Sequence, residues 1–359
     1  MSEPIPILDG HNDTLTRIVA DEADPRSAFL SGRDAGHVDL PRARQGGLAG
    51  AFFAIFTPSR GWAKELRPMH DAEGRVIEGG FSVPPPPRVD RRRALGETLR
   101  HAAELLRWER ASEGALTVVR TTGDLARSRA TGSLAAILHI EGAACIDTRL
   151  EALEVLYAAG LRSLGLVWSR PNAFGHGVPF DFPRAPDIGP GLTAAGHRLV
   201  KACERLGIMI DLSHLNAAGF WDVASRSDRP LVATHSSAFA LSPSPRNLTD
   251  AQLDAVADSG GLVGVNFHTG FLRADGDWTA ATSLERIVAH ARYIADRIGV
   301  EHVALGSDFD GATMPGDLPD VAALPRLVEA LRDGGFDQSD LHRIGFENWE
   351  RVLGDWWHD

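Results

Sequence analysis

The chain has 359 residues, of which 43% are hydrophobic and 24% are charged, proportions that are normal for a soluble globular protein. Its 37 basic and 48 acidic side chains give a formal net charge of -11, which argues against nucleic acid or an anionic membrane as a partner and favours a small molecule. Cys145 and Cys203 are the only cysteines, which excludes a disulfide framework and a cysteine-rich zinc site.

Neither end of the sequence carries a recognisable targeting pattern. "MSEPIPILDG" has no basic region followed by an apolar stretch, and "GDWWHD" is not a hydrophobic tail. We therefore expect a cytoplasmic protein with no membrane attachment. The aromatic "WERVLGDWW" segment is consistent with two roles, a homodimer interface or closure of one end of the fold.

Short apolar runs of strand length recur along the chain, and most are followed by a segment with helical periodicity. Near-continuous apolar strands that alternate with helices indicate a parallel sheet covered by helices, and eight of them predict an α/β fold, a closed (β/α)8 TIM-type barrel formed by one domain over 1–359. The runs span residues 4–11, 47–56, 134–141, 161–169, 207–214, 230–236, 261–268 and 302–310.

The helix predicted within 193–207, between the fourth and fifth strands, illustrates the pattern. Thr193 can cap its start, and Gly207 can end it.

Two connections depart from the regular alternation of strands and helices. The connection between the second and third strands is elaborated, with an extended proline run at 83–87 and a charged helix at 89–112. The loop at 169–191, between the fourth and fifth strands, is rich in glycine and proline and is expected to lie over the strand ends as a lid.

Polar side chains that can bind a metal or transfer a proton follow most of the predicted strands. Barrel enzymes build their active sites at the carboxyl ends of the strands, so residues that are far apart in the sequence should converge at one rim. These residues are His11, Asp13, Glu141, His214, His235, Asp308 and Asp310.

Each of these residues has an alternative, structural interpretation when it is taken alone. His214 could cap the next helix together with Ser213, and His235 could be a hydrogen-bonded core residue. Glu141 is harder to explain in this way, because a carboxylate that ends an apolar strand is costly to bury unless a cation meets it. Asp9 shares the strand parity of His11 but lies deeper, so we expect it to orient a ligand.

The residue types favour a divalent metal over the other chemistries considered. "GSDFDG" lacks the further oxygen ligands of a calcium loop, and "THSS" lies in no nucleophile elbow. Three histidines with carboxylates suit zinc, manganese or a similar ion, and they suffice for two ions if one carboxylate bridges them. Zinc lowers the pKa of a bound water from ~15.7 to ~7 and so supplies a nucleophile near neutral pH.

The motifs "LDGHNDTL", "HIEGA", "IDLSH", "THSS", "PRNLTD", "GLVGVNF" and "ALGSDFDG" occur in the order found in the membrane (renal) dipeptidases, and the chain resembles this family from about residue 5 to "IGFENWERVL". The family comprises binuclear zinc hydrolases of the amidohydrolase superfamily. The resemblance implies a (β/α)8 barrel that hydrolyses dipeptides, often with a D-residue at the carboxyl end, through attack by a metal-bridging hydroxide.

The resemblance also implies a role for each matching residue. His11 and Asp13 correspond to ligands of one zinc ion, His214 and His235 to ligands of the other, and Glu141 to the bridging carboxylate. Asp308 corresponds to the acid that transfers protons, and Arg246 to the group that grips the terminal carboxylate of the substrate; a planar guanidinium suits that task because it pairs bidentately with a carboxylate.

One position departs from the family pattern. Where the family usually has a histidine that contacts the substrate carbonyl, this chain has Trp168 in "LVWSRPN". Tryptophan can pack or donate one N–H, but it cannot carry a positive charge. His176 in the expected lid is a candidate substitute; the alternative is an exposed loop histidine.

The sequence therefore predicts a metallodipeptidase with two Zn2+ ions, or another divalent ion such as Mn2+, and a dipeptide as its partner. Two alternatives stay open. One is a related amidohydrolase that acts on another amide, a β-lactam or a lactone. The other is a metal-stabilised binding protein without catalytic activity.

Overall fold

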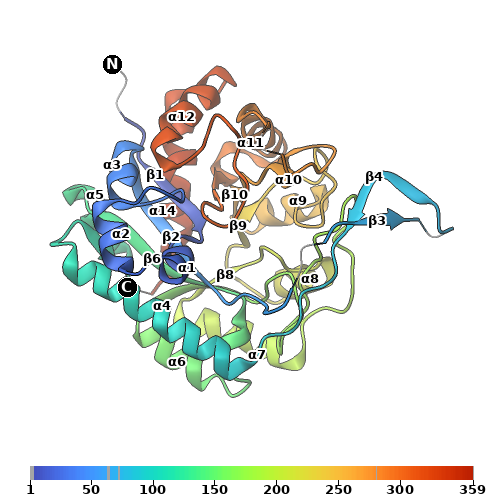
Figure 1. The fold of residues 1–359 in the computed structure, drawn as a ribbon, viewed down its shortest axis with the longest axis horizontal. Helices are drawn as coiled ribbons and strands as arrows, with labels where there is room; N and C mark the ends of the chain where they lie inside the picture. Colours follow the sequence, from blue (N-terminus) through green and yellow to red (C-terminus); the bar gives the residue numbers. More distant parts are fainter. Residues whose placement is uncertain (1–3, 63–64, 72, 280, 359) are drawn as a thin grey trace.

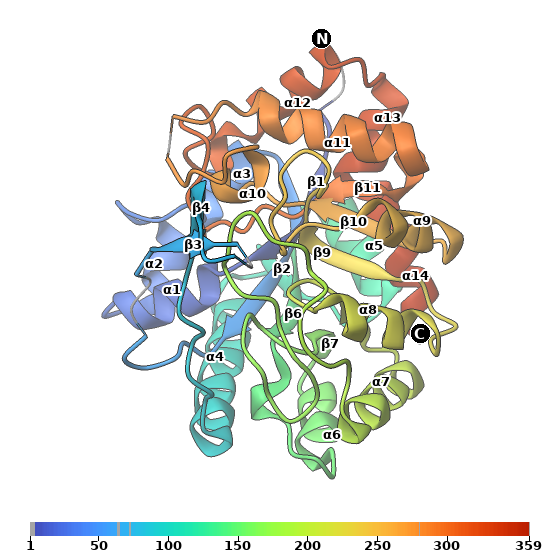
Figure 2. The same ribbon diagram turned by 90° about the vertical axis from the view of Figure 1, so that its right-hand side faces the viewer.

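Eight parallel strands form the centre of the protein in the computed structural model, which describes residues 4–62, 65–71, 73–279 and 281–358. Figure 2 shows these strands at the centre of the molecule, with helices around them. They are β1 (Ile7–Asn12), β2 (Leu48–Phe56), β6 (Leu134–Glu141), β7 (Leu161–Gly165), β8 (Met209–Asp211), β9 (Val232–Ser236), β10 (Leu262–Val265) and β11 (Val303–Leu305).

The sheet closes on itself. The strands follow the order β2-β1-β11-β10-β9-β8-β7-β6, and β2 also pairs with β6 in continuous register from Gly50 with Ala135 to Phe56 with Glu141. All of these pairings are parallel. The predicted (β/α)8 barrel is therefore confirmed, and each predicted apolar run overlaps one barrel strand.

Helices cover the outside of the barrel, which explains why the strands are apolar on both faces (Figure 1). The helix predicted after Thr193 is α7: the Thr193 hydroxyl accepts from the N–H of Gly196, and Gly207 ends the helix with a left-handed φ of 69°. The helices are α1 (Thr14–Asp21), α2 (Pro25–Ser31), α3 (Leu40–Gln45), α4 (Arg91–Ala111), α5 (Thr122–Thr131), α6 (Glu151–Ala158), α7 (Ala194–Leu206), α8 (Ala217–Ala224), α9 (Asp250–Asp258), α10 (Thr269–Leu272), α11 (Glu285–Ile298), α12 (Leu324–Asp333), α13 (Gln338–His342) and α14 (Asn348–Trp356).

The connection between β2 and β6 contains more structure than the sequence predicts. The charged helix is confirmed as α4, but the antiparallel strands β3 (Arg67–His70) and β4 (Val76–Ser82) and the short strand β5 (Leu116–Val118) were not expected. Figure 1 shows the β3–β4 hairpin projecting from the barrel. Its side chains are largely exposed, so it lacks the apolar pattern by which a buried strand is recognised.

The loop at 169–191 contains no helix or regular strand, as expected. It contacts the β3–β4 hairpin, since the backbone N–H of Phe81 donates to the carbonyl of Phe182 at 2.7 Å and the reverse bond is 2.8 Å long. In Figure 2 the loop and the hairpin lie in front of the barrel strands. The loop therefore contributes to the rim where the strands end.

The C-terminal tryptophans pack against the opposite end of the barrel. Trp356 is 1% exposed and donates its indole N–H to the Pro230 carbonyl, just before β9. Trp357 is 5% exposed and donates to the carbonyl of Arg162 in β7. Of the two expected roles, these contacts support closure of the barrel end.

Within the described residues, no helix combines the length and apolar character needed to cross a membrane.

Candidate metal centre and active site

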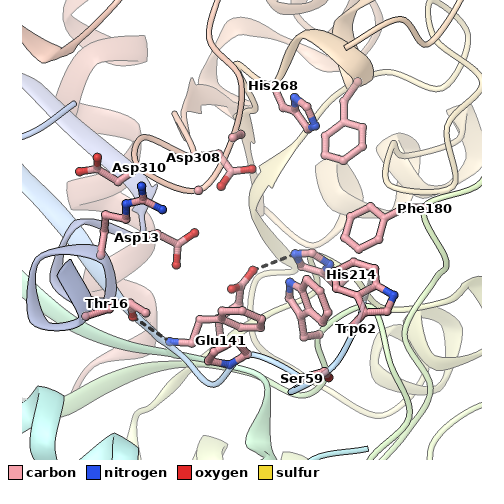
Figure 3. A pocket seen from close by; sticks show the side chains of 18 of the residues that line it. Asp13, Thr16, Ser59, Trp62, Glu141, Phe180, His214, His268, Asp308 and Asp310 are labelled. Atoms are coloured by element: carbon pink, nitrogen blue, oxygen red, sulfur yellow. Dashed lines mark hydrogen bonds and ion pairs between the residues drawn. The ribbon is translucent and has the colours of Figure 1, made fainter. Parts of the chain in front are cut away.

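Five barrel strands bring their terminal polar residues together at one rim. Glu141 lies at the centre, at the end of β6. Its Oε1 is 2.8 Å from His214 Nε2, 3.4 Å from His235 Nε2 and 3.8 Å from His11 Nε2. The carboxylate of Asp13 lies 4.0 Å from His11 Nε2. The strand-end residues predicted from the sequence therefore do converge, and Figure 3 shows Glu141, His214, Asp13 and Asp308 around one cavity.

The donor atoms in this cluster are close enough to hold metal ions. His11, Glu141 and His235 each offer an atom within 4.8 Å of the others, and so do His11, Asp13 and Asp308. His11 belongs to both sets. Two sets of donors that share one histidine are compatible with two adjacent ions of a type that prefers nitrogen and oxygen ligands.

Burial keeps the three histidines of the cluster in the neutral form that metal ligands need. It is the main cause that lowers the pKa of His11, His214 and His235 well below the usual value, so these imidazoles are neutral. Burial, and then the charges of Asp13 and Asp308, raise the pKa of Glu141 well above its usual value.

The polar atoms of the cluster also fit a bound cation. Among the described residues, neither ring nitrogen of His11 has a hydrogen-bond partner, although the side chain is fully buried. A bound divalent cation fits this cluster for two reasons. It would accept the buried nitrogen lone pairs of His11, and it would offset the repulsion between the neighbouring carboxylates.

Hydroxyl groups next to the histidines orient two of the rings. Ser169 Oγ lies 2.8 Å from His214 Nδ1, and Thr234 Oγ1 lies 2.8 Å from His235 Nδ1. Thr234 also donates to Asp211 Oδ2 at 2.8 Å. Partners on Nδ1 leave Nε2 of both rings directed at Glu141, as is usual where histidine binds a metal through Nε2.

The alternative interpretations of His214 and His235 do not account for their positions. Helix α8 is capped by Asn216 and not by His214. His235 is buried and hydrogen-bonded as a core residue would be, yet its ring also faces Glu141.

Asp9 occupies the deeper position expected for it. Its carboxylate accepts from the backbone N–H and the hydroxyl of Ser307 at 2.7 and 2.8 Å, and from the backbone N–H of His11 at 3.4 Å. Burial raises the pKa of Asp9 to about 7 despite these bonds. Asp9 thus links the end of β1 to the segment that follows β11.

Asp308 and Asp310 follow β11 but have different surroundings. Asp308 lines the cavity and accepts a hydrogen bond from Asn266 Nδ2 at 3.0 Å. Asp310 pairs with Arg33 at 2.7 Å and accepts from Thr14 at 2.8 Å. Asp310 also lines the cavity but is held by protein groups, whereas Asp308 faces the candidate metal ligands. Both have a left-handed backbone, with φ of 63° and 65°, a conformation that is costly away from glycine and that often occurs at functional sites.

Arg246 lies close to the cluster but below the cavity surface. It is 2% exposed, donates to the His235 carbonyl at 3.0 Å, and lies 5.3 Å from the centre of the Phe271 ring. It is not among the described residues that line the cavity, whereas Phe271 is. Among the described residues, its Nε has no hydrogen-bond partner, so the guanidinium keeps donor capacity that a ligand could use.

The cavity over the cluster has a volume of about 510 Å³, within the range of small-molecule sites. One wall is acidic and includes Asp13, Asp21 and Asp308. The other is aromatic, and apart from Trp168 its members were not identified as functional from the sequence. Its members are Phe56, Trp62, Trp168, Phe180, His268, Phe271 and Trp278.

The two substrate-contact candidates from the sequence differ in position. Trp168 lines the cavity, packed 4.6 Å from Phe56, 5.4 Å from Phe180 and 5.8 Å from His214 between ring centres. His176 is half-buried, its backbone carbonyl accepts from Asn216, and it is not among the described residues that line the cavity. The assignment of both residues to substrate binding stays a prediction.

A parallel barrel with histidines and carboxylates at the carboxyl ends of its strands is the arrangement expected of a metal-dependent hydrolase of the amidohydrolase type. The chain belongs to the membrane dipeptidase family (peptidase family M19), whose model matches residues 1–356. It is thus an enzyme of a metallodipeptidase family, and the resemblance seen in the sequence is confirmed.

Individual relatives agree with this family. A metallo peptidase from Rhodobacter sphaeroides, solved with a phosphinate mimic of the dipeptide L-Ala-D-Ala, is similar with a TM-score of 0.92 and 46% identity over 99% of this chain and 100% of its own. The dipeptidase AC, also of family M19, has a TM-score of 0.92 and 47% identity over 99% of both chains. An uncharacterized protein in the pqqA 5' region of Klebsiella pneumoniae is 51% identical over 246 residues, which cover 68% of this chain and 91% of its own.

Proposed function

We propose that the protein hydrolyses the peptide bond of dipeptides, including those with a D-residue at the carboxyl end, with two zinc ions at the cluster around Glu141. The observation that carries this proposal is the arrangement of His11, Asp13, His214 and His235 around one buried carboxylate at the base of a cavity. The L-Ala-D-Ala mimic bound by the Rhodobacter sphaeroides relative supports the substrate class.

Each residue has a distinct task in this proposal. His11 and Asp13 would hold one divalent ion and His214 and His235 the other, and the Glu141 carboxylate would contribute to both. Divalent ions bound there would polarise the scissile carbonyl and acidify the attacking water. Asp308 takes the proton of that water and passes it to the leaving amine, as a carboxylate facing the reaction centre can do.

Arg246 is the proposed partner of the substrate's terminal carboxylate. The Nε of Arg246, which has no hydrogen-bond partner among the described residues, supports this assignment. Because Arg246 is 2% exposed and lies against Phe271, the substrate carboxylate reaches it only if the Phe271 ring moves or the carboxylate passes below the cavity surface. A buried guanidinium that gains a carboxylate partner forms a strong, charge-assisted contact.

The position of Arg246 below Phe271 also favours a second candidate function, hydrolysis of an amide, β-lactam or lactone that lacks a free carboxylate. Such a substrate would use the same metal centre and Asp308 but would not need Arg246. The two functions therefore differ in their dependence on this side chain.

A single set of assays distinguishes these functions. Purified protein is loaded with zinc or manganese, its metal content is measured, and L-L and L-D dipeptides are compared with esters and lactones that lack a carboxylate. We expect dipeptide turnover, and an Arg246→Met variant should raise KM for dipeptides while an exposed-site control, Arg149→Met, should not. Metal-loaded enzyme that cleaves no dipeptide would contradict the proposal, and equal losses on both substrate classes would contradict the role of Arg246.

A further inference from the structure

The aromatic wall leaves open which side chain contacts the substrate carbonyl. Trp168 occupies the position of the family's histidine, and its indole is enclosed by Phe56, Trp62 and Phe180. An indole has one N–H and no acceptor or positive charge, so it is a poorer partner for developing negative charge than an imidazole. His176, the substitute considered from the sequence, does not line the cavity.

A different histidine does line the cavity. His268 follows β10 and immediately precedes α10, so it lies at the carboxyl end of a barrel strand like the candidate metal ligands. It is 7% exposed, and its ring is held edge-on between Phe271 at 4.5 Å and Trp278 at 5.1 Å between ring centres. Figure 3 shows its imidazole directed into the cavity that contains Asp308, Glu141 and His214.

The side chain of Asn266 connects His268 to the proposed proton-transfer acid. Asn266 Oδ1 accepts from the backbone N–H of His268 at 2.6 Å, while Asn266 Nδ2 donates to Asp308 Oδ2 at 3.0 Å. A single planar amide therefore bonds both the backbone of His268 and the carboxylate of Asp308. Such a connection is expected where two groups must act on the same bond of a substrate, because a displacement of about 1 Å can cost two orders of magnitude in rate.

We propose that His268 is a catalytic residue that donates a hydrogen bond to the scissile carbonyl oxygen as negative charge develops on it. This proposal rests on the proposed dipeptidase function. His268 would take over, from another strand, the task of the histidine whose position Trp168 occupies. It requires no change in protonation, since a neutral imidazole already carries one N–H that can donate. The proton stays on His268 throughout, and the proton transfers are left to Asp308.

Three variants test the proposal. His268→Phe keeps a ring between Phe271 and Trp278 but removes the donor, His268→Gln keeps an N–H donor, and His358→Gln is the control at an exposed position outside the cavity. Each is compared with wild type for metal content, thermal stability, kcat, KM and inhibition by a phosphinate mimic of L-Ala-D-Ala, whose tetrahedral phosphorus resembles the transition state.

We expect His268→Phe to lower kcat by about 10²–10³-fold and to raise the inhibition constant of the phosphinate by a similar factor. Metal content, thermal stability and KM should stay nearly unchanged. His268→Gln should recover about a tenth or more of the wild-type kcat, and His358→Gln should match wild type. The inhibition constant is a readout that a merely structural role would not move in parallel with kcat.

Several outcomes would overturn the assignment. Unchanged kcat and inhibition for His268→Phe, a change confined to KM, or a loss of bound metal would each contradict a contact with the transition state. If wild type hydrolyses dipeptides and His268→Phe does so equally well, this assignment alone fails. If metal-loaded wild type hydrolyses no dipeptide, the proposed function fails and the assignment of His268 fails with it.

Discussion

At the scale of single residues, Thr234 fixes the orientation of a proposed metal ligand. Its hydroxyl donates to Asp211 and faces Nδ1 of His235, so its oxygen is available to accept the Nδ1–H. Thr234→Val should therefore lower metal affinity by about 10–100-fold, because the ring loses this constraint and Asp211 loses a donor. Competition with a chelating dye measures the affinity.

Thr234→Ser is the matched control for this variant, since it keeps the hydroxyl and should bind metal nearly as tightly as wild type. A Thr234→Val protein with wild-type metal affinity would show that the hydroxyl does not orient His235.

His290 makes stability dependent on pH at a position away from the metal centre. Its Nδ1 accepts from the backbone N–H of Ala238, its Nε2 lies 3.1 Å from the Leu272 carbonyl, and burial lowers its pKa to about 4. Because the unfolded chain binds this proton near pH 6.5, the stability present above that pH should be lost as pH falls toward 4, by about 2–3 kcal/mol between pH 7 and 4.5.

Urea denaturation at the two pH values measures this effect. His290→Gln should reduce the loss of stability between pH 7 and 4.5, whereas the same change at the exposed His70 should leave it as in wild type. An identical pH dependence in His290→Gln and wild type would exclude the buried imidazole as the cause.

At the scale of elements, the N-terminus of α7 anchors the loop that follows β7. The Thr193 hydroxyl accepts from the N–H of Gly196 at 3.1 Å and donates to the Ala173 carbonyl at 2.7 Å. Thr193→Ala should lower the free energy of unfolding by about 1 kcal/mol, because a helix N–H loses its partner. Chemical denaturation measures the change.

The serine variant at the same position should remain close to wild type because it can make both bonds. Equal stability of Thr193→Ala and wild type would show that water replaces the cap without cost.

The eight barrel strands could be predicted because the information that defines them is local. A strand that is buried on both faces, such as Leu134–Glu141, is recognised by its own apolar run, and this run does not depend on which strands it pairs with. The β3–β4 hairpin and β5 lack such an apolar run. The hairpin is largely exposed, and β5 has only three residues, Leu116–Val118, all of which pair with β6. Their existence depends on contacts with other segments.

At the scale of the whole molecule, bound metal would tie together strands from around the barrel. The proposed ligands come from the ends of β1, β6, β8 and β9, and in the sheet β1 and β6 pair with neither β8 nor β9. Chelation should therefore lower the melting temperature, since an ion at 100 times its Kd stabilises the folded state by about 2.7 kcal/mol. Thermal unfolding with a chelator, and after zinc or manganese is added back, measures the effect.

Glu141→Gln serves as the comparison, because an amide is a weaker metal ligand and the variant should respond less to chelation and to added metal. A melting temperature that neither treatment changes would show that no stabilising ion binds in wild type.

The sequence by itself determined the barrel and the set of strand-end donors, because strand burial and side-chain position along a strand are local properties and the carboxyl ends of parallel strands meet at one rim. Only the tertiary structure decided how the rest of the site is built. It placed Arg246 beneath Phe271, left His176 outside the cavity and brought His268 into it. These side chains lie on or beside loops whose paths depend on packing between distant segments, and no local pattern in the sequence records that packing.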